Sequence, residues 1–175
     1  LYALNNGFGI YKGSKPGNDW DWNFLNLSEI DYSYTLAVDP DNDDIVYSGY
    51  SRKPFQTKAM IRKSSDGGST WTTALEIEGA EGITSVLIDP INSDNIFAAA
   101  AGETTGGVWM SRNAGINWEQ TNSLFHFTTI HSFAQSPSNP EIQYAGVWGG
   151  GTYQTKDNGL SWNKLSSEKA FSAAS

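Results

Sequence analysis

The residues that could do chemistry in this chain are few. It has two histidines, His126 and His131, three arginines, Arg52, Arg62 and Arg112, and no cysteine. Two histidines five positions apart, without cysteine beside them, are too few ligands for a zinc site. The lack of thiols excludes disulfides and cysteine nucleophiles. We therefore expect no metal and no cofactor.

An acidic cluster at residues 39–44 is the second candidate, because four aspartates close together can attract Ca²⁺. The corresponding segments at residues 89–92 and 136–139 keep the proline and the asparagine but lack the extra acids. The shared feature is thus a proline turn, and we interpret the added charge at 39–44 as facing solvent.

Composition narrows the classes of partner. The 175 residues carry a net charge of −8, with 38% hydrophobic and 13% aromatic residues. An acidic chain lacks the phosphate-neutralising surface of nucleic-acid-binding proteins. No apolar run reaches membrane-spanning length. We expect a globular protein that neither binds nucleic acid nor inserts into a membrane.

The elements that would position any site are organised around an eight-residue turn, residues 64–71, with the sequence SSDGGSTW. Its aspartate can accept backbone hydrogen bonds, its glycines supply positive φ, and its tryptophan can pin the turn to a sheet. The turn returns at 155–162, more loosely at 111–118, and in a worn form at 13–20. The residues assigned this structural role are Ser64, Asp66, Gly68, Thr70, Trp71, Asn113, Gly115, Trp118, Asp157, Gly159 and Trp162.

The repeat spacing predicts the architecture. The last tryptophans of successive turns are 51, 47 and 44 residues apart, a period typical of propeller blades. Each repeat contains an innermost strand A, a proline turn, strand B, a loop, strand C, the octad turn and strand D. We predict an all-β protein, a β-propeller of four-stranded antiparallel blades, about four in this chain, with residues 1–175 as a single propeller domain or propeller fragment.

The two ends of the chain leave two alternatives open. Residues 1–4 look like a strand B without its strand A, and residues 171–174 look like a strand A without its strand B. The ends could complete one blade together and close a small ring of four. Alternatively, the chain could belong to a larger propeller or a homo-oligomer.

The octads resemble the Asp-box, or BNR, repeat, Ser-x-Asp-x-Gly-x-Thr-Trp, over essentially the whole chain. Families with this repeat include sialidases, xyloglucanase-type glycoside hydrolases, sortilin-type receptors and photosystem assembly factors. The resemblance implies a β-propeller whose boxes lie between strands C and D at the periphery, away from the ligand face. The boxes are then folding devices and not a catalytic site.

The resemblance also limits which chemistry is expected. Sialidases use three arginines that converge on the substrate carboxylate, whereas Arg62 and Arg112 lie in or beside strand C and the octad turn. A sialidase is therefore not expected. Xyloglucanase-type enzymes place two carboxylates across a cleft between two propellers, and 175 residues cannot supply both propellers. The candidate acids on the ligand-side loops are Glu29, Asp31, Glu76, Glu78, Glu81 and Glu103.

A set of aromatic and polar residues falls on the connections expected to rim one mouth of the channel, those from strand D to strand A and from strand B to strand C. Aromatic faces beside polar groups suit stacking on sugar rings or gripping a peptide; the competing interpretation is that half of them pack between blades. The candidate binding residues are Tyr32, Tyr34, Tyr50, Arg52, Phe55, Glu103, His126, His131 and Trp148.

The sequence thus favours a secreted or cell-surface module that binds a glycan or a protein and has no catalysis of its own. The negative charge favours a neutral ligand, because an acidic one would be repelled. Two alternatives stay open: a fragment of an Asp-box glycoside hydrolase of the xyloglucanase type, and a structural block of an extracellular assembly.

Overall fold

The structure is a computed structural model that describes residues 1–5, 9–25, 32–51, 58–102, 105–121 and 129–166. The regular elements in these ranges are β-strands, and all neighbouring strands pair antiparallel. No helix in the described part of the chain is long and apolar enough to cross a membrane. The all-β prediction is confirmed.

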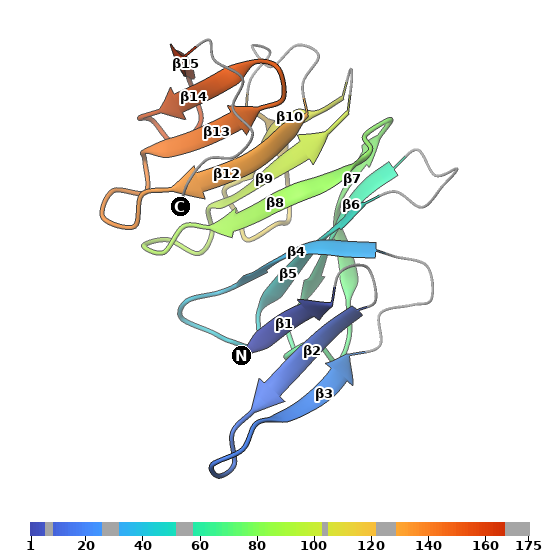
Figure 1. Cartoon of the computed structure of the whole chain (residues 1–175). Helices are drawn as coiled ribbons and strands as arrows, with labels where there is room; N and C mark the ends of the chain where they lie inside the picture. The colour runs from blue at the N-terminus through green and yellow to red at the C-terminus, as the bar shows by residue number, and fades with distance from the viewer. Residues whose placement is uncertain (6–8, 26–31, 52–57, 103–104, 122–128, 167–175) are drawn as a thin grey trace.

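The described residues form fifteen strands, which are arranged as four consecutive blades (Figure 1). The first blade has three described strands, β1 (Tyr2–Asn5), β2 (Gly9–Ser14) and β3 (Asp21–Leu25). The second blade comprises β4 (Tyr32–Val38), β5 (Val46–Ser51), β6 (Lys58–Ser64) and β7 (Thr72–Glu78). The third blade comprises β8 (Gly82–Ile88), β9 (Ile96–Ala101), β10 (Gly107–Ser111) and β11 (Glu119–Gln120). The fourth blade comprises β12 (Ile130–Gln135), β13 (Gln143–Val147), β14 (Gly151–Thr155) and β15 (Asn163–Ser166).

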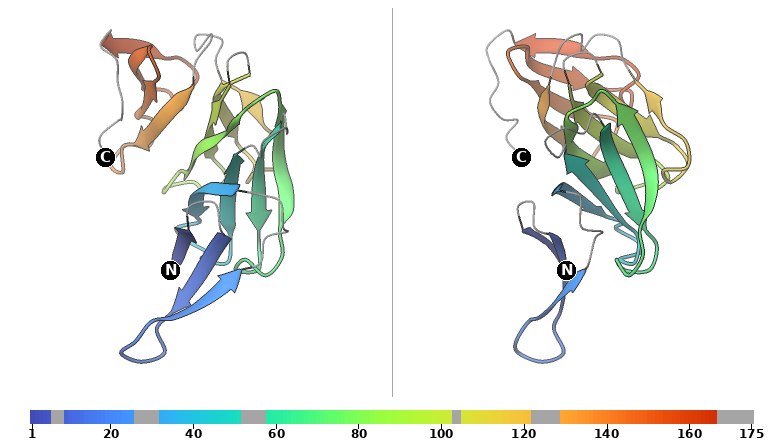
Figure 2. Two further views of the ribbon diagram at one scale, coloured as in Figure 1. Left: turned by 45° about the vertical axis from the view of Figure 1, so that its right-hand side comes forward. Right: turned by 90° about the vertical axis from the view of Figure 1, so that its right-hand side faces the viewer.

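The blades follow one another along an arc. The innermost strands β4, β8 and β12 lie side by side, and the first and fourth blades lie at opposite ends in all views (Figures 1 and 2). The described residues therefore do not form a closed ring. Residues 171–174 lie outside the described ranges, so their pairing with residues 1–4 stays a prediction.

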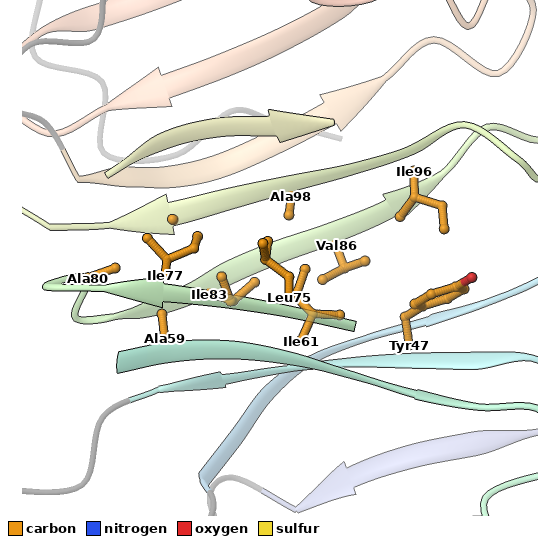
Figure 3. Packing of buried hydrophobic residues seen from close by; sticks show 11 residues of the cluster. Tyr47, Ala59, Ile61, Leu75, Ile77, Ala80, Ile83, Val86, Ile96 and Ala98 are labelled. Atoms are coloured by element: carbon orange, nitrogen blue, oxygen red, sulfur yellow. The ribbon is translucent and has the colours of Figure 1, made fainter. Parts of the chain in front are cut away.

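An apolar cluster fills each of the three junctions between adjacent blades. Figure 3 shows the cluster between the second and third blades, where Ile61 and Ile77 face Ile83 and Val86. Strand β9 has the sequence IFAAAA and is buried along its whole length. Such a continuous apolar run suits a strand covered on both faces, and its alanines let the neighbouring blades approach closely.

Candidate functional site

The octad turn of the second blade is a closed network of hydrogen bonds. The Ser64 hydroxyl accepts the Gly68 N–H at 2.8 Å and donates to the Asp66 carboxylate at 2.8 Å. Asp66 also accepts the N–H and the hydroxyl of Thr70, at 2.8 and 2.6 Å. The Trp71 indole N–H donates to the Gly68 carbonyl at 2.9 Å. The donors of the turn thus occupy both oxygens of its carboxylate.

The third and fourth blades repeat this network. Asn113 accepts the N–H of Asn117 at 2.8 Å, and Asp157 accepts the N–H of Ser161 at 2.9 Å. Trp118 and Trp162 donate to the carbonyls of Gly115 and Gly159. These hydrogen bonds of the four residues are therefore internal to each turn.

The carboxylates of the turns are held in the charged form. Hydrogen bonds from the Thr70 hydroxyl, the Thr70 N–H and the Ser64 hydroxyl lower the pKa of Asp66 from 3.8 to about 2. Desolvation by burial opposes ionisation of Asp157, but hydrogen bonds from Ser161 and Thr155 outweigh it, and its pKa is also lowered. The charge of each aspartate is thus stabilised by its own turn.

The worn first copy differs from the other three. In the third blade the octad runs from Ser111 to Trp118. Trp109, two residues before this octad, pairs with Gln120, two residues after Trp118, and the second and fourth blades have the same register. In the first blade the matching residue, Tyr11, pairs with Phe24. Trp22 therefore occupies the register position of the octad tryptophans. The sequence alignment that gave this position to Trp20 was wrong, because the first turn is two residues longer.

A pocket of about 550 Å³ lies at the opposite end of the blades. It is lined by residues at the start of the innermost strands, such as Gly82 of β8, at the end of the second strands, such as Ala101 of β9, and in the adjoining connections. Three candidate binding residues are brought together here from two blades, Tyr34 from the second and His131 and Trp148 from the fourth. The lining consists of Tyr34, Glu81, Gly82, Ile83, Thr84, Ala101, Thr129, His131 and Trp148. We call this feature the mouth pocket.

The three described innermost strands, β4, β8 and β12, carry a β-bulge at the same place, between Ser33 and Thr35, Ile83 and Ser85, and Ile130 and Ser132. The residues that the bulges leave without a cross-strand partner are Tyr34, Thr84 and His131, and all three line the mouth pocket. A bulge turns the extra side chain out of the normal alternation and often accompanies binding sites. The fold thus presents one variable side chain per blade at the mouth.

Trp148 is 57% exposed, and Tyr34 in the same pocket is 53% exposed. The Trp148 ring lies 5.0 Å from that of His131, tilted by 41°. The backbone N–H of Trp148 donates to the Thr129 carbonyl at 3.0 Å, and the backbone N–H of Gly150 donates to the Val147 carbonyl at 3.0 Å. Gly149 adopts φ +70°, a conformation that glycine adopts without strain. Trp148 is thus an exposed aromatic face on a hydrogen-bonded turn.

Among the remaining candidate binding residues, Tyr50 is the one whose side chain the structure describes, and it does not lie at the mouth. Tyr50 is 1% exposed and packs with Ile10 between the first and second blades, with the Arg62 guanidinium 5.7 Å from its ring centre. Its assignment as a binding residue was wrong, because strand alternation turns it into the junction. Tyr32 begins β4, and its side chain is not described. Arg52, Phe55, Glu103 and His126 lie outside the described residues.

The candidate carboxylates fall into three groups: two on an outer strand, one in the mouth pocket, and three outside the described residues. Glu76 and Glu78 lie on the outer strand β7 and pair with Lys58 at 3.4 and 2.7 Å. Of the described residues, Glu81 alone contributes a carboxylate to the mouth pocket. Glu29, Asp31 and Glu103 lie outside the described ranges. No group of three or more histidine, aspartate or glutamate residues that could hold a metal occurs in the described part of the chain.

Sequence reasoning missed Thr84 and Thr129. Thr84 donates its hydroxyl to the Ile130 carbonyl at 2.6 Å, which joins the third blade to the fourth at the pocket. A threonine in an apolar strand reads as an ordinary strand residue, and only the bulge reveals that it faces the mouth.

No protein-family model matches the sequence. The chain is 25% identical over 153 residues to a xyloglucanase from a Paenibacillus species and 26% identical over 137 residues to a xyloglucanase of Hypocrea jecorina. These matches cover 79% and 73% of this chain but only 14% and 15% of the relatives, so the chain spans about a seventh of their length.

Solved structures extend the likeness to nearly the whole chain. The GH74 xyloglucanase of Xanthomonas campestris matches with a TM-score of 0.70 and 20% identity, over 97% of this chain and 29% of its own. The GH74 enzyme of Niastella koreensis matches with a TM-score of 0.66 and 19% identity, over 96% and 28%. The β-propeller domain of Myceliophthora thermophila Swd1 matches with a TM-score of 0.59 and 10% identity, over 92% and 55%. The chain consists of β-propeller blades, and its similarity in sequence is to proteins named xyloglucanase.

Proposed function

We propose that this chain is part of a larger, secreted or cell-surface propeller of the xyloglucanase kind and that its mouth pocket binds a neutral polysaccharide. The observation that carries the proposal is the convergence of Tyr34 from the second blade with His131 and Trp148 from the fourth on one pocket. An exposed aromatic face with polar groups beside it is suited to the apolar face and the hydroxyls of a sugar ring.

The net charge and the sequence similarity both support a neutral glycan as the ligand. The net charge of −8 would repel an acidic polymer, and the pocket itself contains Glu81. The two sequence relatives are named xyloglucanase, and a polysaccharide of that class is neutral. The extracellular location is proposed because such a ligand is found outside the cell.

We assign binding, and not catalysis, to this chain by itself. Hydrolysis of a glycosidic bond by the usual route needs two carboxylates that flank the bond. The described part of the mouth pocket supplies one, Glu81. A second candidate function is that Glu81 contributes one acid to an active site that the rest of a longer enzyme completes, which the named relatives favour.

We also propose that the octads are Asp-boxes of the BNR type. The same side chain-to-backbone network in three blades supports this, because the third-position side chain accepts the N–H of the seventh residue in each. In this proposal the octads stabilise the blades and contact no ligand.

The test is a titration with xyloglucan oligosaccharides and cellohexaose, followed by tryptophan fluorescence and calorimetry. We expect Trp148→Ala to weaken binding about tenfold, or ~1.4 kcal/mol, because a stacking face is lost. Trp20→Ala is the matched control, since Trp20 is 47% exposed on the first blade, outside the pocket. Unchanged affinity in Trp148→Ala, or an equal loss in Trp20→Ala, would contradict the assignment of the mouth pocket.

The second candidate is tested with the longer protein that contains this segment. If Glu81 is one of the reacting acids, Glu81→Gln should abolish turnover of xyloglucan and leave binding of the oligosaccharides intact. Normal turnover in Glu81→Gln would exclude a catalytic role for this residue.

A further inference from the structure

One face of the first blade is aromatic and uncovered in the described structure. Trp20, Trp22 and Phe24 occupy alternate positions on or next to β3 and are 47%, 41% and 51% exposed. The rings of Trp20 and Trp22 stack, with their centres 5.7 Å apart and 27° between their planes. Tyr11 on β2 adds a fourth ring, 5.2 Å from Phe24. We call these four residues the aromatic face.

Two glycines of the neighbouring strand lie beneath the aromatic face. Gly9 and Gly13 lie on β2 opposite the rings, and a Cβ atom at either position would meet Phe24 at 2.3 Å or Trp22 at 2.9 Å. The rings of Phe24 and Trp22 therefore occupy the space that side chains at Gly9 and Gly13 would need. No member of the aromatic face is charged, although the chain as a whole is strongly acidic.

The aromatic face corresponds by register to surfaces that are covered in the other blades. Trp22 matches Trp71, Trp118 and Trp162, as the cross-strand pairs show. Tyr11 occupies the strand C position of Trp109 and Tyr153.

Each of those equivalents packs against the preceding blade. Trp71 contacts the cluster around Ile10 of the first blade. Trp109 and Trp118 contact the cluster that contains Ile61 of the second. Trp162, at 4% exposed, packs with Phe97 of the third. The same register position is therefore an interblade contact in every blade that has a described predecessor.

We propose that the aromatic face is the seat of a preceding propeller blade. The inference rests on the proposal that these blades belong to a larger propeller, and it specifies the side on which another blade docks and the surface that receives it. The occupant is an uncharged sheet face like those that cover the equivalent surfaces, with aliphatic side chains such as Ala59 and Ile61 or Val108 and Met110 on its third strand. It would also bring an innermost strand to β1, whose other edge carries no strand in the described part of the chain.

The repeat itself provides a probe. Tyr2 pairs with Lys12 as Phe97 pairs with Met110, so Leu1 occupies the register position of Ile96. A second copy of residues 32–95 fused directly before Leu1 therefore supplies one complete blade, the following innermost strand and its proline turn in register. A fusion of equal length made of glycine and serine is the control.

The decisive measurement is the effect of Trp22→Ala on the melting temperature in two backgrounds. In the 175-residue chain we expect a small change, because Trp22 is 41% exposed and its stacking partner Trp20 lies in the same blade. In the blade fusion we expect a fall of several degrees, accompanied by a blue shift of tryptophan emission that the glycine-serine fusion lacks. An unchanged melting temperature in both backgrounds, or proteolytic trimming of the added blade back to Leu1, would overturn the proposal.

The same proteins separate this inference from glycan binding. If the aromatic face were instead a sugar platform, cellohexaose would quench Trp22 in the 175-residue chain and Trp22→Ala would weaken its binding; that result contradicts a blade seat. Binding at the mouth pocket is measured independently with Trp148→Ala. Loss of the proposed mouth function would leave the Trp22 result interpretable, and the reverse also holds.

Discussion

The two ends of the blades are built on opposite principles. At the turn end, three octads repeat one hydrogen-bond network, with small changes such as Asn113 in place of an aspartate. At the mouth end, the equivalent bulge positions hold three different side chains, Tyr34, Thr84 and His131. The blades therefore repeat the same hydrogen-bonding chemistry at the turn end and carry different side chains at the mouth end.

The difference indicates where stability and recognition reside. The first- and third-position side chains of the octads bond within their own turns, so substitutions there should change the free energy of unfolding. In the mouth pocket Tyr34 and Trp148 are exposed, and the bulge residues differ from blade to blade, as a specific ligand requires. Substitutions there should change affinity and leave stability nearly unaltered.

The largest expected effect is at the turn end. Trp162 is 4% exposed, packs against Phe133 with ring centres 5.9 Å apart, and donates to Gly159. Trp162→Ala should lower the free energy of unfolding by about 3–5 kcal/mol, measured by urea denaturation. Trp148→Ala is the matched control at the mouth and should stay within about 0.5 kcal/mol of the wild type. Similar losses in both variants would break the comparison.

The next effect concerns the hydroxyl at the start of the octad. Ser64 is buried, and its oxygen accepts the N–H groups of Gly68 and Asp66. Ser64→Ala leaves buried donors unsatisfied and should cost about 1–3 kcal/mol in the free energy of unfolding. Ser69→Ala, in the same turn but exposed, should cost less than about 0.5 kcal/mol. Equal effects at the two serines would mean that the network does not stabilise the blade.

A smaller loss of stability is expected at Thr84, the mouth residue that also links two blades. Thr84 lines the pocket, but its hydroxyl also bonds the Ile130 carbonyl of the next blade at 2.6 Å. Thr84→Val keeps the shape and removes the bond, so we expect a loss of about 1 kcal/mol. Thr84→Ser retains the hydroxyl and should restore much of the stability. If Thr84→Val were neutral, the mouth bulges would carry recognition alone.

The sequence predicted the turn end better than the mouth end, for a physical reason. An octad is local: Ser64, Asp66 and Trp71 bond within eight residues, so residue types and spacing reveal the turn and its period. The first copy was misaligned because it has no such network, and the register of Tyr11 and Phe24 that corrects it is set by strand pairing.

The mouth depends on contacts between blades and on bulges, which the residue types alone do not reveal. Trp148 among glycines could be predicted as exposed. Tyr50 could not be separated from it, because only the alternation of β5 against the first blade shows that Tyr50 is buried. Thr84 was missed for the same reason, since a bulge changes the side on which a strand residue lies.

The acid dependence of stability should come from the turn end. The folded-state pKa of Asp66 is lowered to about 2 from 3.8, and that of Asp157 is also lowered. A lowered folded pKa gives stability that is complete above the unfolded value and lost as pH falls through the folded one. We therefore expect the melting temperature to decline below about pH 4. Asp66→Asn should reduce that decline, whereas His131→Ala should leave the acid limb unchanged.

The smallest effect isolates backbone strain in the octad. The fourth position is left-handed in the third and fourth blades: Ala114 has φ 53° and Asn158 has φ 57°, and Gly67 has φ 68° in the second. A left-handed alanine costs about 1 kcal/mol or more, while glycine adds roughly 0.4–1 kcal/mol of entropy to the unfolded chain. Ala114→Gly should therefore stabilise the protein by roughly 0.5 kcal/mol, measured by urea denaturation. Its carbonyl still accepts the Tyr47 hydroxyl and the Lys63 ammonium, both at 2.8 Å, so the link to the second blade is unchanged. Asn158→Gly is the control and should gain less, because asparagine tolerates this conformation better than alanine. A loss of stability in Ala114→Gly would mean that the alanine methyl group contributes packing that exceeds the strain, and that the octads are not interchangeable.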